Sequence, residues 1–233
     1  MGEIQQNINQ IQKRIEAAAQ RSGRKKEDIL LLAVSKTIDV ERIKEAVACG
    51  LKELGENKVQ EILEKYEPMG EEVKWHLIGH LQTNKVKYII DKVKLIHSVE
   101  SLKLAEEISK RAKKANKVMD ILIEVNMAAE ESKFGVAPED TLSLIQKIAL
   151  LDNICIRGLM TVAPFVENSE ENRECFRRMK QLSVDINAEK IDNVYMDILS
   201  MGMSNDFEVA IEEGATIVRV GTSIFGRRIY PQK

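Results

Sequence analysis

The chain has 233 residues, 44% of them hydrophobic and 31% charged, and its 35 basic and 37 acidic side chains leave a formal charge of −2 at pH 7. This composition is typical of a globular protein that is long enough to bury a substantial core. It disfavours a general nucleic-acid or acidic-membrane binder, because such proteins usually carry a basic surplus. The 3 cysteines are too few for a disulfide framework, and their odd number fits a reducing compartment.

No segment of the sequence has the pattern of a targeting or membrane-spanning element. From Met1 to Ile15 the chain is polar and amphipathic, without the apolar centre of a signal peptide. The longest purely apolar run, Ile29 to Val34, is too short to cross a bilayer. We therefore expect a cytoplasmic protein, monomeric, that binds neither membrane nor nucleic acid.

Short β-rich apolar runs alternate along the chain with longer stretches of helical periodicity. The predicted strands are Ile29–Val34, Lys52–Gly55, Trp75–Ile78, Leu95–Val99, Met119–Val125, Cys155–Met160, Tyr195–Leu199 and Thr216–Val220. A stretch that predicts a helix follows each of the first seven. Examples are Val40–Cys49, Lys58–Tyr66, Ser101–Ala115 and Pro138–Leu150.

The helix predicted over Val40–Cys49 shows how local signals set its ends. Its apolar residues fall three and four positions apart, which places them on one buried face. Asp39 precedes it as an N-cap, and Gly50 stands where the helix end needs a left-handed residue.

Strict alternation of strands and helices predicts an α/β fold with parallel strands and crossover helices. Eight regularly spaced strands favour a closed (β/α)8 TIM barrel, with Gly2–Ser22 as an extra N-terminal helix. No linker-like composition divides the chain, so residues 1–233 are expected to form a single domain. An open doubly wound sheet remains the alternative, because one short strand is easily overcounted.

In such barrels the functional residues gather at the carboxyl ends of the strands. Lys36 directly follows the first strand and is therefore expected at the barrel mouth. Partial burial there would lower the pKa of a lysine and make its amine competent to form a Schiff base. The alternative is a rim lysine that reaches out to solvent.

The loops after the seventh and eighth strands are rich in glycine and hydroxyl side chains. They span residues 200–206 and 219–223, where barrels commonly bind phosphate through backbone amides. Ser204 and Thr222 would add hydroxyl donors. Asn57, after the second strand, is equally explained as the cap of the helix that follows.

Arg219 lies two residues before Gly221, so both point to the same side of the last strand. An inward guanidinium would lie close to the phosphate loop, unless it pairs with an acid such as Glu124 or Asp197. A lysine, a phosphate site and an inward arginine together favour pyridoxal phosphate as ligand. His76 and His80 have a spacing that suits a metal on a helix, but the first lies in a predicted strand, so no metal site is predicted.

Several ordered motifs resemble the YggS/PROSC family, the pyridoxal phosphate homeostasis proteins. The resemblance extends from about residue 3 to residue 229. Its motifs are Leu31–Thr37, Gly55–Asn57, Trp75–Lys85, Ser132–Gly135, Arg157–Thr161, Leu199–Ser204 and Arg219–Gly226. It implies a barrel of the alanine racemase type, PLP fold type III, without the C-terminal β domain of the racemases.

The resemblance also implies roles for particular residues. Lys36 would be the imine lysine and Arg219 the partner of the pyridine nitrogen. The remaining cofactor-binding residues that it implies are Ser204, Gly221 and Thr222 for the phosphate, Asn57 and Met203 for the ring, and Lys133 for handling the cofactor beyond the imine. For Lys133 a solvated loop lysine is the alternative.

Three functions fit these residues: a protein that binds and delivers pyridoxal phosphate without turnover, a one-domain amino-acid racemase, and a phosphate-ester enzyme. Racemisation needs acid–base groups on both faces of the imine. In alanine racemases the second group is a tyrosine from the β domain, which this sequence is expected to lack. We therefore favour the binding protein, with apo-enzymes as recipients and no catalytic residue.

Overall fold

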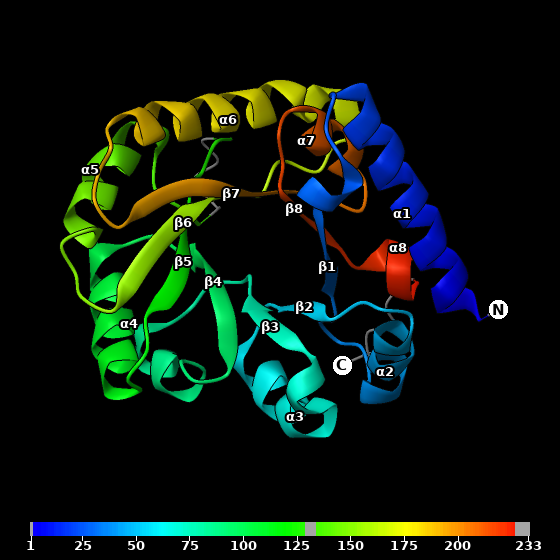
Figure 1. Ribbon diagram of the computed structural model, residues 1–233, viewed down its shortest axis with the longest axis horizontal. Coiled ribbons are helices and arrows are strands. Elements are labelled where there is room, and N and C mark those ends of the chain that lie inside the picture. Colours follow the sequence, from blue (N-terminus) through cyan, green and yellow to red (C-terminus); the bar gives the residue numbers. More distant parts are fainter. Residues whose placement is uncertain (1, 129–133, 227–233) are drawn as a thin grey trace.

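The computed structural model of the chain describes residues 2–128 and 134–226. Eight parallel strands form a closed barrel in the order β1 to β8, and helices surround it (Figure 1). The strands are β1 Leu30–Val34, β2 Glu53–Glu56, β3 Lys74–Leu77, β4 Val93–Val99, β5 Met119–Glu124, β6 Ile154–Met160, β7 Val194–Met203 and β8 Ile217–Val220. The TIM barrel predicted from the sequence is confirmed, and the open sheet is wrong because β1 pairs with β8.

The helices confirm the alternating pattern, with one exception. They are α1 Glu3–Arg21, α2 Val40–Ala48, α3 Val59–Met69, α4 Leu102–Lys114, α5 Pro138–Ile148, α6 Arg173–Ala188, α7 Phe207–Glu212 and α8 Thr222–Phe225. Between β3 and β4 the predicted helix is a short 3-10 segment, η3 Thr83–Tyr88. The other 3-10 segments are η1 Lys26–Asp28, η2 Gly70–Glu72 and η4 Ser169–Asn172.

Local end signals acted as expected at α2. The Asp39 side chain accepts a hydrogen bond from the Arg42 amide, and Gly50 adopts a φ of +94° beyond the helix end. The seventh strand differs from its prediction, because residues 200–203 continue β7 instead of starting a loop. Glycine and serine hid this extension, since neither residue favours a strand.

The barrel has an apolar core on each side of its strands. A large cluster fills the layer between strands and helices, and a smaller one inside the barrel contains Leu32, Leu95, Leu122, Met160 and Ile217. The interior also holds buried polar residues, among them His76, His97, Ser200 and Arg219. This polar group is unusual, because barrel interiors are dominated by branched apolar side chains.

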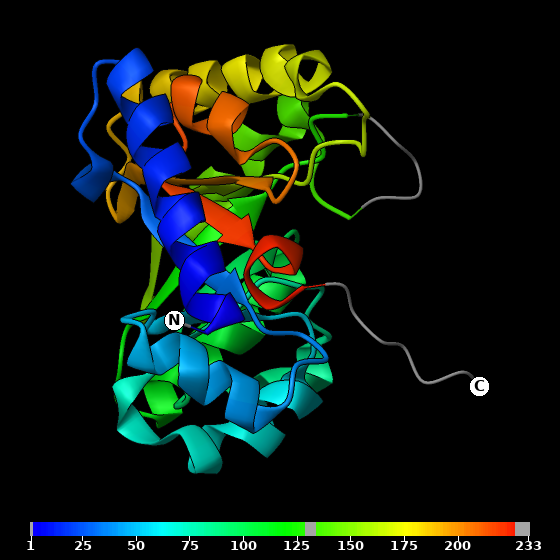
Figure 2. The ribbon, with the colours of Figure 1, turned by 90° about the vertical axis from the view of Figure 1, so that its right-hand side faces the viewer.

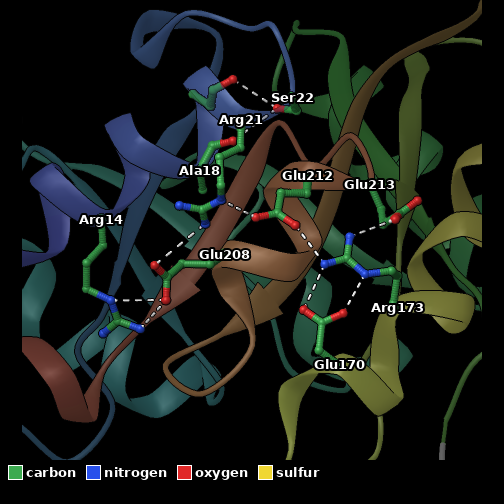
Figure 3. Close-up of polar contacts among 10 residues, drawn as sticks. Arg14, Ala18, Arg21, Ser22, Glu170, Arg173, Glu208, Glu212 and Glu213 are labelled. Atoms are coloured by element: carbon green, nitrogen blue, oxygen red, sulfur yellow. Dashed lines mark hydrogen bonds and ion pairs between the residues drawn. The ribbon is translucent and has the colours of Figure 1, made fainter.

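Helix α1 lies along the outside of the barrel, against α7 and α8 (Figure 2). Four isoleucines on one face of α1 are buried, namely Ile4, Ile8, Ile11 and Ile15. Ion pairs join Arg14 and Arg21 of α1 to Glu208 and Glu212 of α7 (Figure 3). Among the helices of the described ranges, none is long and apolar enough to span a membrane.

Candidate functional site

A cavity of about 330 Å³ opens where β1, β2, β3, β6, β7 and β8 end. Its lining collects residues that lie far apart in the sequence. Those predicted from the sequence are Lys36, Asn57, Met203, Ser204, Arg219, Gly221 and Thr222. The structure therefore brings together seven of the eight candidate residues. The eighth, Lys133, lies outside the described residues.

The turn that carries Lys36 is held by a buried ion cluster. The Lys65 ammonium donates to the Ser35 carbonyl (2.9 Å) and to Glu56 Oε1 (2.8 Å). The Ser35 hydroxyl donates to the same carboxylate oxygen at 2.7 Å. Burial raises the pKa of Glu56, and Lys65 opposes that shift. The residue before Lys36 is thus tied to β2 and α3 by charged hydrogen bonds, which are stronger than neutral ones.

The residue after Lys36 is fixed by the same cluster. Thr37 has a φ of +63°, a left-handed conformation that is uncommon for a branched side chain. Its amide donates to Glu61 Oε2 at 2.6 Å, and Lys65 contacts that oxygen at 3.0 Å. Such strained residues persist where the surrounding structure over-determines them. Lys36 therefore stands on a turn with little freedom.

Asn57 lies against Gly79, the residue that follows Ile78 in the loop after β3. A Cβ at Gly79 would stand 2.5 Å from the Asn57 carbonyl oxygen, so only glycine permits this approach. The alternative explanation of Asn57 as a helix cap is wrong, because the N-cap of α3 is Lys58. Half-buried Asn57 lines the cavity instead.

The predicted phosphate loops meet at one side of the cavity. The Gly221 amide donates to the Ser204 hydroxyl at 3.4 Å, which joins the end of β7 to the start of α8. Thr222 is exposed beside them. Hydroxyl groups, a glycine amide and the unpaired first amides of a helix are suitable donors for a phosphate.

Arg219 is buried in the barrel interior and lines the cavity from that side. Its guanidinium donates to the Ser200 carbonyl (2.7 Å), the Ser200 hydroxyl (2.8 Å) and the Thr161 carbonyl (2.8 Å). Burial lowers its pKa to about 10, against the opposing fields of Glu124 and Asp206. An arginine with this pKa remains charged at neutral pH.

The alternative ion pairs of Arg219 with Glu124 or Asp197 do not form. Asp197 is paired with Arg157 instead. Glu124 lies near enough to influence Arg219, but its Oε2 is buried and has no hydrogen-bond partner among the described residues. Burial and the nearby Glu100 raise the pKa of Glu124 to about 7.

Sequence reasoning missed one wall of the cavity, formed by the loop after β6. Val162, Pro164, Phe165 and Val166 line it, and Phe165 is 88% exposed. A run of apolar residues directly after a strand was the signal that could have found this wall. The two histidines weighed as a metal pair do not converge: His76 contacts Glu53, whereas His80 contacts Glu100.

The model of the alanine racemase N-terminal domain matches residues 3–229. A pyridoxal phosphate homeostasis protein from Aquifex aeolicus (strain VF5) is 50% identical over 226 residues, which are 97% of this chain and 98% of that protein. The chain belongs to the family of pyridoxal phosphate homeostasis proteins. This confirms the resemblance seen in the sequence motifs.

Other relatives in this family agree. The pyridoxal phosphate homeostasis protein of Pseudomonas aeruginosa is 39% identical over 99% of this chain and 98% of its own length. The structure of PipY from Synechococcus elongatus PCC7942 with PLP bound has a TM-score of 0.80 and 32% identity, over 93% of this chain and all (100%) of that one. An alanine racemase from Clostridium difficile has a TM-score of 0.75 at 19% identity, over 98% of this chain and 57% of its own, which shows a shared fold only.

Proposed function

We propose that this protein binds pyridoxal 5'-phosphate as a Schiff base on Lys36 and acts in the intracellular homeostasis of that cofactor, delivering it to apo-enzymes without turnover. The observation that carries the proposal is the single cavity that unites Lys36 with Arg219 and the loops of Ser204 and Gly221. PipY, a relative at 32% identity, has a structure with PLP bound.

The donor set fits the chemical groups of this cofactor. Lys36 offers an amine for the aldehyde, with loss of water. The Ser204 and Thr222 hydroxyls offer neutral donors for the phosphate, and the Gly221 amide, which donates to Ser204 at 3.4 Å, lies beside them. Arg219 donates only, and its placement in the cavity suits an acceptor such as an unprotonated pyridine nitrogen. Once bound, the cofactor would supply an electrophilic aldehyde and a ring that is a weak electron sink, because its nitrogen carries no proton.

The described lining supports binding without turnover. Its titratable residues among positions 2–128 and 134–226 are Lys36, Asp206 and Arg219. Both oxygens of Asp206 are already engaged, since they accept from the Met203 amide (2.7 Å) and from Asn172 (2.8 Å). Racemisation requires a proton donor on the face opposite Lys36, and this lining supplies no evident one.

An absorbance titration tests the binding. Adding pyridoxal phosphate to the purified protein should produce the visible band of a lysine imine. Lys36→Ala should abolish that band, and Lys44→Ala, an exposed lysine on α2, should leave it unchanged. Equal bands in wild type and Lys36→Ala would refute the proposal.

Exchange at the amino-acid Cα tests the absence of turnover. Alanine or serine incubated in deuterated water with the loaded protein should exchange no faster than with free pyridoxal phosphate. A missing general acid or base typically costs about 10²–10⁴-fold in rate. Exchange with inversion, abolished by Lys36→Ala, would instead establish the one-domain racemase.

A further inference from the structure

A chain of hydrogen bonds crosses the interior of the barrel behind Arg219. The Arg219 guanidinium donates to the Ser200 hydroxyl at 2.8 Å, and that hydroxyl lies 2.9 Å from Nδ1 of His97. His97 Nε2 lies 2.9 Å from Nδ1 of His76, whose Nε2 lies 2.7 Å from Glu53 Oε2. Five side chains from five strands, β8, β7, β4, β3 and β2, thus form one continuous path.

The path connects the cavity with the opposite end of the barrel. Ser200, His97 and His76 are buried, with exposures of 0%, 0% and 1%. Glu53 is the first residue of β2, whereas Arg219 lines the cavity at the other end. Glu53 is half-buried and pairs outside the barrel with Lys94 (3.0 Å) and Lys74 (3.5 Å). Neither histidine belongs to the cavity lining.

The charge states of the chain follow from its surroundings. Burial lowers the pKa of His76 and lowers that of His97 well below its usual value, so both rings are neutral at pH 7. Glu53 is ionised: burial would raise its pKa, but hydrogen bonds from His76 and Lys94 lower it to about 2. Arg219 is a cation that donates and never accepts.

These states permit only one direction of donation. An ionised carboxylate only accepts, so Nε2 of His76 must carry its proton and Nδ1 must be bare. His97 then donates from Nε2 and accepts at Nδ1, and the Ser200 hydroxyl donates to His97. The lone pairs of Ser200 consequently face Arg219. Every donor in the chain finds an acceptor, and the path ends on an anion.

We propose that Glu53, His76 and His97 are positioning residues that hold the Ser200 hydroxyl as an acceptor and so fix the Arg219 guanidinium at the floor of the cavity. Together with the Ser200 and Thr161 carbonyls, the hydroxyl sets the plane of the guanidinium. The other charged groups that face Arg219 are Glu124 and Asp206. The expected effect on the affinity for pyridoxal phosphate rests on the proposed function, whereas the hydrogen-bonded path from Glu53 to Arg219 does not.

Nitrogen NMR of the ¹⁵N-labelled apo-protein tests the direction of the chain. The sequence has only 3 histidines, and His80→Gln assigns the third signal. At pH 7 both His76 and His97 should show a protonated Nε2 and a bare Nδ1. A protonated Nδ1 on either ring, or a doubly protonated ring, would overturn the proposal.

Two variants test the coupling along the chain. Glu53→Gln removes the charge at the end without removing volume, and it should populate the second tautomer of His76, whereas Glu72→Gln, an exposed acid, should not. Ser200→Ala should shift the His97 Nδ1 signal and weaken pyridoxal phosphate binding by about tenfold, the worth of one hydrogen bond. Ser200→Thr, which keeps the hydroxyl, should restore both.

The outcomes separate this proposal from the proposed function. If the predicted tautomers are present but the wild type does not bind pyridoxal phosphate, the direction of the hydrogen-bonded path is established and the proposed function is refuted. If the wild type binds the cofactor while Glu53→Gln leaves the His76 tautomer unchanged and Ser200→Ala leaves His97 and the affinity unchanged, the positioning role is refuted and the function stands.

Discussion

Two buried acids near the barrel mouth, Glu56 and Glu124, differ in their neighbours. Oε1 of Glu56 accepts hydrogen bonds from both the Lys65 ammonium and the Ser35 hydroxyl. Glu124 lies near a second acid, Glu100, and Oε2 of both Glu56 and Glu124 lacks a hydrogen-bond partner among the described residues. Burial favours the neutral form of a carboxyl; a nearby acid adds to that effect, whereas a contacting ammonium opposes it. The two residues should therefore affect stability in different ways.

Glu124 should make the protein less stable as the pH rises. Burial and Glu100 raise its folded pKa from 4.5 to about 7, so the folded state binds the extra proton between these values. Its contribution is complete below pH 4.5 and is lost as the pH rises through about 7, up to about 3 kcal/mol in all. Urea unfolding of Glu124→Gln should show a smaller loss of stability between pH 5 and pH 8 than the wild type shows.

Glu64→Gln is the matched control, because it makes the same change at an exposed position of α3. Its pH dependence should equal that of the wild type. Identical curves for Glu124→Gln and Glu64→Gln would show that folding does not raise the pKa of Glu124.

Lys65→Met should destabilise the protein by about 3–5 kcal/mol, because it leaves the Glu56 carboxylate buried without its cation. Lys65 is 6% exposed, and Met replaces its alkyl chain but not its three hydrogen bonds. Chemical denaturation measures the loss. Lys44→Met on the exposed face of α2 should change the free energy of unfolding by less than about 0.5 kcal/mol. Equal effects would mean that the cluster around Lys36 contributes no stability.

The end of β7 determines how Met203, its last residue, and Ser204, which follows it, reach the cavity. Gly202 has a φ of +86°, and a Cβ there would lie 2.5 Å from the Cβ of Ala210 in α7. The glycine thus allows α7 to pack closely against the strand immediately before the cavity residues. The sequence predicts a loop from residue 200 onward, because strand propensity does not register a glycine that packing requires.

Gly202→Ala should cost more stability than Gly50→Ala. Both residues have positive φ, +86° and +94°, but a Cβ at Gly50 would meet nothing within 4 Å. Gly50→Ala therefore measures the backbone strain alone, roughly 1 kcal/mol. Gly202→Ala adds the contact with Ala210, for a total of about 3 kcal/mol, since overpacking adds typically 1–3 kcal/mol. Equal losses in thermal or urea unfolding would show that β7 and α7 can separate freely.

In the whole molecule, α1 covers the outside of the barrel and packs against both α7 and α8. The Asn7 side chain donates to the Ile224 carbonyl of α8 at 3.0 Å. The ion pairs continue from Glu212 to Arg173 of α6 at 2.7 Å (Figure 3). The helix thereby contacts both elements that follow the phosphate loops, so its packing supports the geometry of the cavity.

Ile8→Ala should destabilise the barrel by about 2–5 kcal/mol, the range for removing a large buried side chain. Ile8 is 1% exposed between α1 and the barrel. Val184→Ala on α6, where the side chain is 47% exposed, is the control and should change the free energy of unfolding by less than about 0.5 kcal/mol. A similar loss for both variants would mean that α1 is not part of the folded core.

The barrel could be predicted from the sequence because strand and helix patterns alternate along it with short connections. It also indicated the cavity residues that stand at strand ends, such as Lys36 and Arg219. The Lys65 cluster and the histidine chain could not be predicted. Lys65 is separated in sequence by 30 positions from its partner Ser35, and His97 is separated by 103 positions from Ser200. Only the barrel register brings such residues into contact.

Reduction of the loaded protein followed by peptide mapping shows which lysine forms the imine. Borohydride converts a lysine imine of pyridoxal phosphate into a stable amine, which mass spectrometry locates in the digested chain. The label should lie on Lys36 and should be lost from that peptide in Lys36→Ala. A label found mainly on another lysine of the wild-type protein, or none at saturating cofactor, would contradict it.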